Sequence, residues 1–367
     1  MKLLWCWVVT LSILFRYVLY RLGLCGRPLF TDHWDRVEVV YRQITRMDSR
    51  IRVRHAERCP KGHPAVYAGN HTKLDDPFFV CYAVQEASAY TMHTRFVMRD
   101  DFFEGFPWNW LPFRMNEIAE MGGSYNISQK SASIAQLRPL VDMLLAPDSF
   151  VIFPGGGRST SGLWMESHVG DEPGSIAFFL AQAQRKDPSI AVPAVPVGRT
   201  YNPVKNVSAV IVGEPRCLPP AARREAQRTF DDALFTDISD LVEIHLLHLL
   251  CGILYLRCRH GIPGPISRGD LAAQCRGVLE RITGRYTDPA LPTDLDRDLD
   301  RTLAYLKKHG AVQYDGRAAT PDRDTILTPR PHTTRFRLEN PVQYHVNQIV
   351  HLADVMAALE VAVLAGR

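Results

Sequence analysis

The sequence AVYAGNHTKLDDPFFVCYAV, residues 65–84, joins two apolar runs through a polar turn. The first run, 65–68, is short and continuous, as in a buried strand, and the second, 78–84, is typical of a helix. The turn between them carries His71 and, five residues later, Asp76 at the entrance of the expected helix. This spacing can bring an imidazole and a carboxylate within hydrogen-bond reach. The carboxylate would fix the ring tautomer, so that the outer nitrogen can act as a general base.

Both residues also have ordinary structural interpretations. An Asp followed by Pro at the start of a helix is a common N-cap signal, so Asp76 can be explained without catalysis. His71 can be a loop residue that happens to carry an imidazole. The spacing alone leaves both interpretations open, and the rest of the chain has to decide between them.

Around this turn, short strand-like runs alternate with longer helical runs. We expect strands at 65–68, 95–98, 149–153, 190–197 and 208–212, and helices at 77–86, 128–145 and 174–185. This alternation favours an α/β fold with a mixed, mostly parallel sheet flanked by helices. Such sheets bind ligands at the carboxyl ends of their strands, where His71 and Pro154 both fall.

The N-terminus differs from everything after it, because residues 3–15 are almost entirely apolar. Thirteen residues are short of the roughly 20 that a bilayer span needs, but extension to Leu24 gives the length, with Arg16 and Arg21 snorkelling to a cytoplasmic surface. No Ala-x-Ala-like site follows for a cleaved signal peptide, and a buried helix is the structural alternative. We expect residues 1–30 to form a membrane anchor or an interfacial helix, with a lipid surface as partner and the rest of the chain on its cytoplasmic side.

The second half of the chain is mainly helical. Residues 217–260 are expected to form a helical connector that includes an apolar core helix at 246–256, and a Gly- and Pro-rich break follows at 261–265. The region 261–367 is expected to be a mainly helical domain, with helices at 268–283, 295–308 and 342–364 and short strands at 311–314 and 325–328. Two helices before a hairpin suggest a winged-helix-like arrangement. Four aspartates between 294 and 300 favour a structural role for it over DNA binding.

Composition excludes several classes of protein. The 367 residues are 46% apolar and 22% charged, as in a folded protein, and the net charge of +4 is small. No concentrated basic stripe indicates nucleic-acid binding. The eight cysteines are scattered without a Cys-x-x-Cys pair, which indicates buried or incidental thiols in a reducing compartment. We therefore expect neither a metal site nor a cofactor.

A second polar turn, PGGGRSTSG at residues 154–162, follows the strand expected at 149–153. Its glycines let the backbone approach a ligand and aim amides at an anion, and Arg158 supplies a planar fork suited to phosphate. The turn has neither the Lys-Ser/Thr pair of a Walker loop nor the glycine-flanked serine of a nucleophile elbow.

Taken together, the two turns resemble the glycerolipid acyltransferase superfamily. That family uses an Asn-His-x4-Asp block for catalysis, matched at 70–76, and a Phe-Pro-Glu-Gly-x-Arg-Ser-like block for the acceptor, matched at 153–159. Its Val-Pro-rich strand is matched at 192–197. The resemblance covers about residues 55–215 and implies an acyltransferase domain over 31–216.

Two details are similar to the glycerol-3-phosphate acyltransferase branch. One is the Gly-Gly-Arg-Ser form of residues 156–159; the other is a Tyr-x-x-Asn-x-x-x-His segment at 344–351, which can also be an ordinary amphipathic helix. Two positions depart from the family. Gly155 stands in place of its glutamate, and Gln129, beside Lys130, in place of its arginine. Because the family binds its acceptor there, the departures imply an unusual acceptor or reduced activity.

The resemblance implies transfer of a fatty acyl group from acyl-CoA or acyl carrier protein to a hydroxyl of glycerol-3-phosphate or a related phosphorylated glycerol-type acceptor. His71 would be the general base and Asp76 its orienting acid. No serine or cysteine is placed as a nucleophile, which favours direct transfer without an acyl-enzyme. The residues implied in acceptor binding are Gly156, Gly157, Arg158 and Ser159, with Lys73 and Lys130 as weaker candidates.

Three alternatives remain open at this point. Within the enzyme class, lysophosphatidate or dihydroxyacetone phosphate could be the acceptor. A hydrolase would use His71 with water and release free fatty acid. A non-catalytic lipid-binding relative would turn over no acceptor at all.

Overall fold

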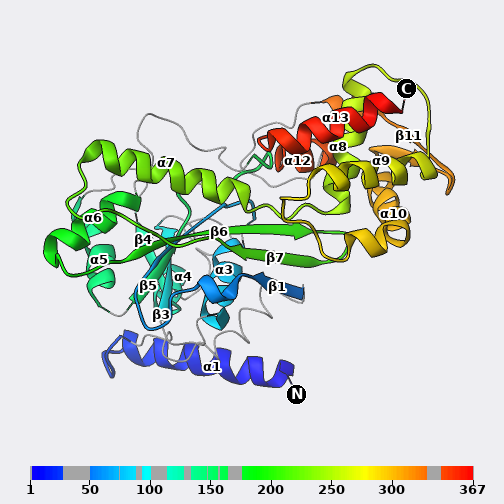
Figure 1. Ribbon diagram of the computed structural model, residues 1–367. Coiled ribbons are helices and arrows are strands. Elements are labelled where there is room, and N and C mark those ends of the chain that lie inside the picture. Colours follow the sequence, from blue (N-terminus) through cyan, green and yellow to red (C-terminus); the bar gives the residue numbers. More distant parts are fainter. Residues whose placement is uncertain are drawn as a thin grey trace.

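The computed structural model describes residues 2–27, 50–73, 75–87, 93–100, 114–127, 134–146, 148–155, 158–163, 176–328 and 340–366. An α/β part built on one twisted sheet adjoins a helical part that contains the C-terminus (Figure 1).

The described residues of the α/β part form an eight-stranded sheet. Its strands are β1 (Arg50–Arg54), β2 (Val66–Gly69), β3 (His93–Arg99), β4 (Ser124–Ile127), β5 (Asp148–Ile152), β6 (Pro193–Asn202), β7 (Val207–Val212) and β8 (Arg216–Cys217). The order is β1-β7-β6-β2-β5-β3-β4, with β8 also paired to β6. The pairs of β6 with β7 and β8 are antiparallel and the others are parallel. The prediction of a mixed, mostly parallel sheet is confirmed.

Helices cover both faces of this sheet (Figure 1). One face packs against α3 (Asp76–Ala87) and α4 (Met115–Met121), and the other against α5 (Ile134–Leu145), α6 (Ile176–Lys186) and α7 (Arg224–Asp240). Alternate residues of β2 serve the two cores: Val66 and Ala68 pack in the cluster with α5, α6 and α7, while Tyr67 packs in the cluster with α3. A strand buried on both faces has to be apolar throughout, which explains the continuous run that marks β2 in the sequence.

The N-terminal helix α1 (Lys2–Arg21) lies on the α4 side of the sheet (Figure 1). It docks through polar contacts: the Tyr17 hydroxyl donates to Glu117 at 3.1 Å, and Arg21 pairs with the same carboxylate at 3.1 Å. No helix in the described part of the chain is both long enough and apolar enough to cross a membrane. The apolar side chains that α1 and the turn after it leave exposed are Leu4, Trp7, Val8, Leu11, Phe15, Val18, Leu22 and Leu24.

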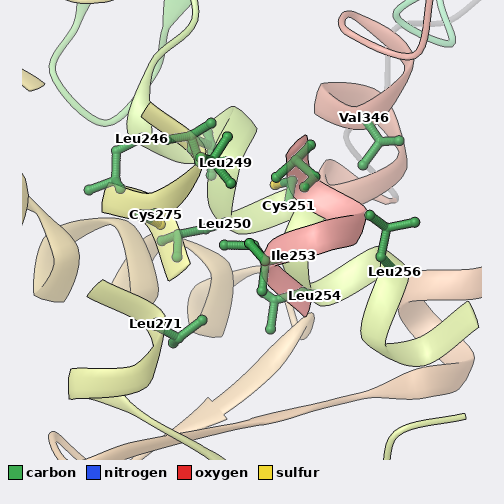
Figure 2. Packing of buried hydrophobic residues seen from close by; sticks show 14 of the residues in the cluster. Leu246, Leu249, Leu250, Cys251, Ile253, Leu254, Leu256, Leu271, Cys275 and Val346 are labelled. Carbon is green, nitrogen blue, oxygen red and sulfur yellow. The ribbon is translucent and has the colours of Figure 1, made fainter. Parts of the chain in front are cut away.

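The helical part is built around α8 (Leu246–Arg259), whose leucines and isoleucine form the centre of one buried cluster (Figure 2). Around it lie α9 (Arg268–Arg281), α10 (Leu291–Lys308), α11 (Arg323–Leu327), α12 (Pro341–Asn347) and α13 (Ala353–Ala365). A small sheet is formed by β9 (Ile266–Ser267), β10 (Val312–Tyr314) and β11 (Ala318–Pro321) in the order β10-β11-β9. The helical C-terminal region is therefore confirmed, while its winged-helix-like classification stays a prediction.

Two details of the sequence prediction for this region are wrong. Residues 325–328 do not form the second strand of the hairpin, because Asp322 caps a helix there by accepting a hydrogen bond from the Thr325 amide at 2.8 Å. The chain turns back earlier, at Gly316, where φ is +91°. The expected single helix over 342–364 is also two helices, since the amides of Ile349 and Leu352 bond three residues back rather than four.

In the α/β part, the helix expected at 128–145 appears as α5 from residue 134, and 128–133 lie outside the described residues. Strand β1 is absent from the sequence prediction. Its Arg52 forms ion pairs with Glu243 and, at 3.2 Å, with Asp288, which join the sheet edge to the helical part. Three arginines in five residues obscure the strand in the sequence, and the charges of Arg52 and Arg54 find their partners only after folding.

Candidate active site

The turn between β2 and α3 brings His71 and Asp76 together. The His71 Nδ1 lies 3.0 Å from Asp76 Oδ2, and the same oxygen accepts hydrogen bonds from the amides of Thr72 and Lys73, each at 2.6 Å. Asp76 is the first residue of α3 and is fully buried. It therefore ties down the turn that precedes its helix and holds the imidazole. This geometry fits the orienting interpretation, while the carboxylate bonds to amides before the helix rather than to those of the first helical turn, so Asp76 does not act as an N-cap.

Arg199, from the middle of β6, completes the charge arrangement behind this pair. Its Nη1 donates to Asp76 Oδ1 at 2.5 Å and to Asp75 Oδ1 at 2.9 Å. Its Nη2 donates to the Ser208 hydroxyl at 3.1 Å, and the guanidinium lies 3.7 Å from the centre of the Phe79 ring. Each oxygen of the Asp76 carboxylate thus has its own donors: one faces the histidine and the turn, the other the arginine.

Asn70 fixes the turn to the same strand. Its side-chain amide donates to the Arg199 carbonyl at 2.9 Å, and its side-chain oxygen accepts from the Arg199 amide at 2.7 Å. The Asn70 side chain thus bonds to both main-chain polar groups of Arg199, as a neighbouring strand would. These two bonds hold Asn70, the residue before His71, against β6. The register of β2 beside β6, with Gly69 opposite Val197, brings these two positions together.

The electrostatics of the buried pair follow from these contacts. Burial is the largest influence on Asp76 and by itself would raise its pKa, but Arg199, His71 and the Lys73 amide together hold that pKa below its ordinary value. Burial would lower the pKa of Arg199, and its two carboxylate partners raise it instead. Asp76 is therefore an anion at neutral pH and can accept the Nδ1 proton of His71 in a hydrogen bond.

The His71 ring is held between this carboxylate and an aromatic side chain. It stacks on Phe153 with ring centres 4.5 Å apart and planes inclined by 26°. Because the ionised Asp76 accepts a hydrogen bond, Nδ1 carries the proton and Nε2 is left as the basic nitrogen. The side chain is 18% exposed, so the ring is restrained without being sealed from solvent.

The second polar turn lies directly beside the first. The Ser159 amide donates to the His71 carbonyl at 2.7 Å, and the Ser159 hydroxyl accepts from the Gly162 amide at 3.1 Å. Ser159 is buried and Arg158 half-buried. The structure therefore brings together two motifs that are about eighty residues apart in the sequence.

The other predicted acceptor residues are placed as follows. Lys73 is half-buried, and its Nζ lies 3.4 Å from the centre of the Tyr201 ring. Gly155 is half-buried at the end of β5. Gly156, Gly157, Gln129 and Lys130 lie outside the described residues.

Within the described residues, His245, His248 and His345 lie close enough to hold a metal ion, with ligand atoms within 4.8 Å of one another. Their geometry is that of a helix start instead. The rings of His245 and His248 stack at 3.7 Å, and His248 Nδ1 accepts from the His245 amide at 3.3 Å while its Nε2 meets Gln348 at 2.8 Å. Both ring nitrogens of His248 are engaged in hydrogen bonds, which leaves this ring no free lone pair for a metal ion, so we assign these histidines to packing.

Sequence reasoning missed Arg199 and Asp75 as members of the site, and it gave Asn70 no role although this residue begins the matched block. A signal for Arg199 was present, since an arginine in the middle of a strand that is otherwise buried needs a buried anion beside it. The sequence could not say which anion this was. Only the pairing of β6 beside β2 places Arg199 behind Asp76.

Residues 50–198 match the family model described as Acyltransferase. The α/β part of the chain therefore contains a domain of the acyltransferase family. The matched residues run from β1 into β6 and include both polar turns. No curated protein matches this chain. Among solved structures, the 1-acyl-sn-glycerophosphate (LPA) acyltransferase of Thermotoga maritima is similar with a TM-score of 0.36 and 16% identity, over 66% of this chain and 98% of that one.

Proposed function

We propose that this acyltransferase moves a fatty acyl group from an acyl thioester to a hydroxyl of glycerol-3-phosphate or a related phosphorylated glycerol-type acceptor. The observation that carries the proposal is the His71–Asp76–Arg199 arrangement. It supplies a histidine with a fixed tautomer, backed by a stable buried anion, beside a turn that contributes Arg158.

In the proposed reaction, His71 Nε2 takes the proton of the acceptor hydroxyl while the hydroxyl oxygen attacks the thioester carbonyl. The tetrahedral intermediate collapses, the carbon–sulfur bond breaks, and the imidazolium returns its proton to the leaving thiolate. Asp76 stabilises the imidazolium between these steps, and Arg199 keeps Asp76 ionised. A positioned general base of this kind contributes about 10²–10⁴-fold to the rate.

The acceptor phosphate would bind at the second turn, through Arg158 and the amides of Gly156 and Gly157. A guanidinium binds a phosphate in two-pronged geometry, and backbone amides at glycines can approach it closely. The Gly-Gly-Arg-Ser form of this turn and the segment that contains Tyr344 support glycerol-3-phosphate as the acceptor. Lysophosphatidate and dihydroxyacetone phosphate share the phosphate and a reactive hydroxyl, and belong in the same test.

Direct transfer is favoured over an acyl-enzyme. Burial raises the pKa of Cys59 to about 12 and raises that of Cys81 as well, so neither thiol offers a thiolate at neutral pH. Both thioester and acceptor would then have to be bound together. The donor can be acyl-CoA or an acyl carrier protein.

Helix α1 supports a membrane-surface location. Its exposed apolar side chains recur at helical spacing, with Leu4, Leu11, Phe15 and Val18 on one stripe, while Tyr17 on the opposite side is buried. Such a helix can lie in the lipid interface with its apolar face buried by about 5–10 Å. This would hold the site near its acyl donors and products on the cytoplasmic face. Loss of vesicle co-sedimentation in a Leu11→Glu/Phe15→Glu variant tests the assignment, and unchanged binding would contradict it.

The function is tested with full-length protein in detergent. Acyl-CoA and acyl carrier protein donors are each combined with glycerol-3-phosphate, dihydroxyacetone phosphate, lysophosphatidate or no acceptor, and products are identified by mass spectrometry. We expect an acylated product that depends on an acceptor. Free fatty acid without acceptor dependence would indicate a hydrolase, and no turnover with any pair would indicate a binding protein; either result contradicts the proposal.

Arg158→Ala tests the acceptor end of the site. We expect the acceptor KM to rise while the KM of the thioester changes little, because only the acceptor carries the phosphate in question. Arg185→Ala, on the exposed end of α6, is the matched control and should change neither constant. An unchanged acceptor KM in Arg158→Ala would remove this residue from the phosphate site.

A further inference from the structure

The segment Tyr344-x-x-Asn347-x-x-x-His351 joins the helical part to the α/β part. Asn347, the last residue of α12, donates its side-chain amide to the Ser161 carbonyl at 3.0 Å. His351 lies in the turn after α12, and its Nε2 meets the Ser239 carbonyl near the end of α7 at 2.8 Å. Both contacts cross more than 100 residues of sequence, and the first ends on the turn that carries Arg158 and Ser159.

Tyr344 contacts the same turn through its backbone. Gly162 has φ of +95°, and a Cβ at this position would lie 2.3 Å from the Tyr344 carbonyl oxygen. Only glycine tolerates both the backbone conformation and the approach of another main chain. The PGGGRSTSG turn therefore ends on a glycine because α12 presses against it there.

A short series of hydrogen bonds leads from this contact to the catalytic histidine. Gly162 donates its amide to the Ser159 hydroxyl at 3.1 Å, and Ser159 donates its own amide to the His71 carbonyl at 2.7 Å. The backbone of His71 is thus hydrogen-bonded to one end of the turn 159–162, and α12 contacts the other end of this turn.

Helix α12 is itself held firmly. Val346 is 1% exposed and lies in the α8 cluster (Figure 2). Gln348, just after the helix, meets His248 Nε2 at 2.8 Å, and that histidine is buried at the start of α8. A helix end that is packed in a core and tied by a buried hydrogen bond is a rigid support. His248 thus helps to fix the end of α12.

We propose that Asn347 and Tyr344 are positioning residues of the acyl-transfer site: α12 fixes the turn 159–162 and, through it, Arg158 and His71. This inference rests on the proposed function for its kinetic readout. It also gives the C-terminal segment a function. The sequence alone allows an ordinary amphipathic helix here, but such a helix would not require an asparagine that donates to the Ser161 carbonyl in another part of the chain.

Two substitutions at one position test the proposal. Asn347→Ala removes the donor to Ser161 and should lower kcat and raise the acceptor KM, by about 5–10-fold in kcat/KM, with the thioester KM unchanged. Asn347→Asp has nearly the same shape but sets a carboxylate against the Ser161 carbonyl, so its loss should be larger. Because a protonated carboxyl can donate again, its activity relative to the native protein should recover as pH is lowered.

The control is Val355→Ala, which truncates a buried side chain of α13 in the same core without touching the turn. It should lose stability and keep native kcat and KM. Hydrogen exchange gives a readout independent of turnover: peptides that contain Ser159 and Gly162 should exchange faster in Asn347→Ala and not in Val355→Ala.

Unchanged exchange in these peptides together with native constants in both Asn347 variants would overturn the proposal. So would equal kinetic losses in Val355→Ala and Asn347→Ala at equal loss of stability, because the effect would then be general destabilisation. If the native protein transferred acyl groups to no acceptor, the proposed function would fail, while the exchange experiment would still decide whether α12 positions the turn.

Discussion

Two parts of this protein make opposite uses of the histidine side chain. In the α/β part, His71 is 18% exposed and lies 3.0 Å from a buried carboxylate that an arginine supports from behind. In the helical part, His245, His248 and His345 are almost completely buried and lie against one another and Gln348.

The difference lies in what each imidazole faces. The Asp76 carboxylate holds the Nδ1 side of His71 and leaves Nε2 to accept a proton, as a general base must. Burial, reinforced by its two histidine neighbours, lowers the pKa of His245 well below its usual range, and burial lowers that of His248 to about 4. The histidine count of a sequence therefore says little about chemistry until the neighbours of each ring are known.

The largest expected effect separates the two groups directly. His71→Ala should lower kcat by about 10²–10⁴-fold with little change in stability, since its ring lies at the edge of the core. His248→Gln should lose stability and lower kcat per folded molecule far less than His71→Ala does, because it can act on the site only through α12. Measurements of kcat and of urea unfolding on each variant test both predictions. Equal turnover in His71→Ala and the native protein would remove His71 from catalysis.

The second prediction concerns the anion that distinguishes the two groups. Arg199→Met leaves Asp75 and Asp76 without their buried cation and should cost about 3–5 kcal/mol of stability. The pKa of Asp76 should rise, so that the acid limb of the pH–rate profile moves to higher pH in whatever protein folds. Arg199→Lys keeps the charge and should show smaller changes of the same kind. A stable Arg199→Met protein with a native pH profile would refute the role of this arginine.

The two groups should also lose stability in different pH windows. The folded-state pKa of His248 is below 6.5, so the unfolded chain binds a proton first, and stability falls from about pH 6.5 toward 4, by up to about 3 kcal/mol. The Asp76 pKa is lowered from 3.8, so its contribution is present at higher pH and is lost only below about 3.8.

Urea unfolding from pH 7.5 to 4 measures this slope. His248→Gln should flatten it, and His63→Gln, at an exposed histidine, should not. A slope that is equal in all three proteins would mean that the buried histidines do not titrate in this range.

The smallest expected effect is at Lys73, whose ammonium lies over the Tyr201 ring. A double-mutant cycle of Lys73→Met with Tyr201→Leu should give a coupling of about 0.5–1 kcal/mol, as for a partly exposed cation–π pair. The acceptor KM of Lys73→Met should stay within about twofold of the native value. A tenfold rise without coupling to Tyr201 would instead make Lys73 an acceptor ligand.

Local patterns of the sequence were sufficient where one segment makes its own structure. The strand–turn–helix around His71 follows from an apolar run, a polar turn and an Asp-Pro start, and the alternation of such units gave the α/β class. Local patterns failed where partners come from elsewhere: β1 was obscured by arginines whose carboxylates lie some 190 residues away, and the region 325–328 was assigned to a strand although Asp322 caps a helix there.

What the sequence determined by itself is the His71–Asp76 pair, because five residues of turn and one helical start place both side chains. Only the tertiary structure decided which residues support this pair. The pairing of β2 with β6 places Arg199 behind Asp76, and Asn347 and Tyr344 contact the second turn. The physical reason is that a short-range geometry is encoded in adjacent residues, whereas a buried charge or a rigid support needs a partner that only packing can bring near.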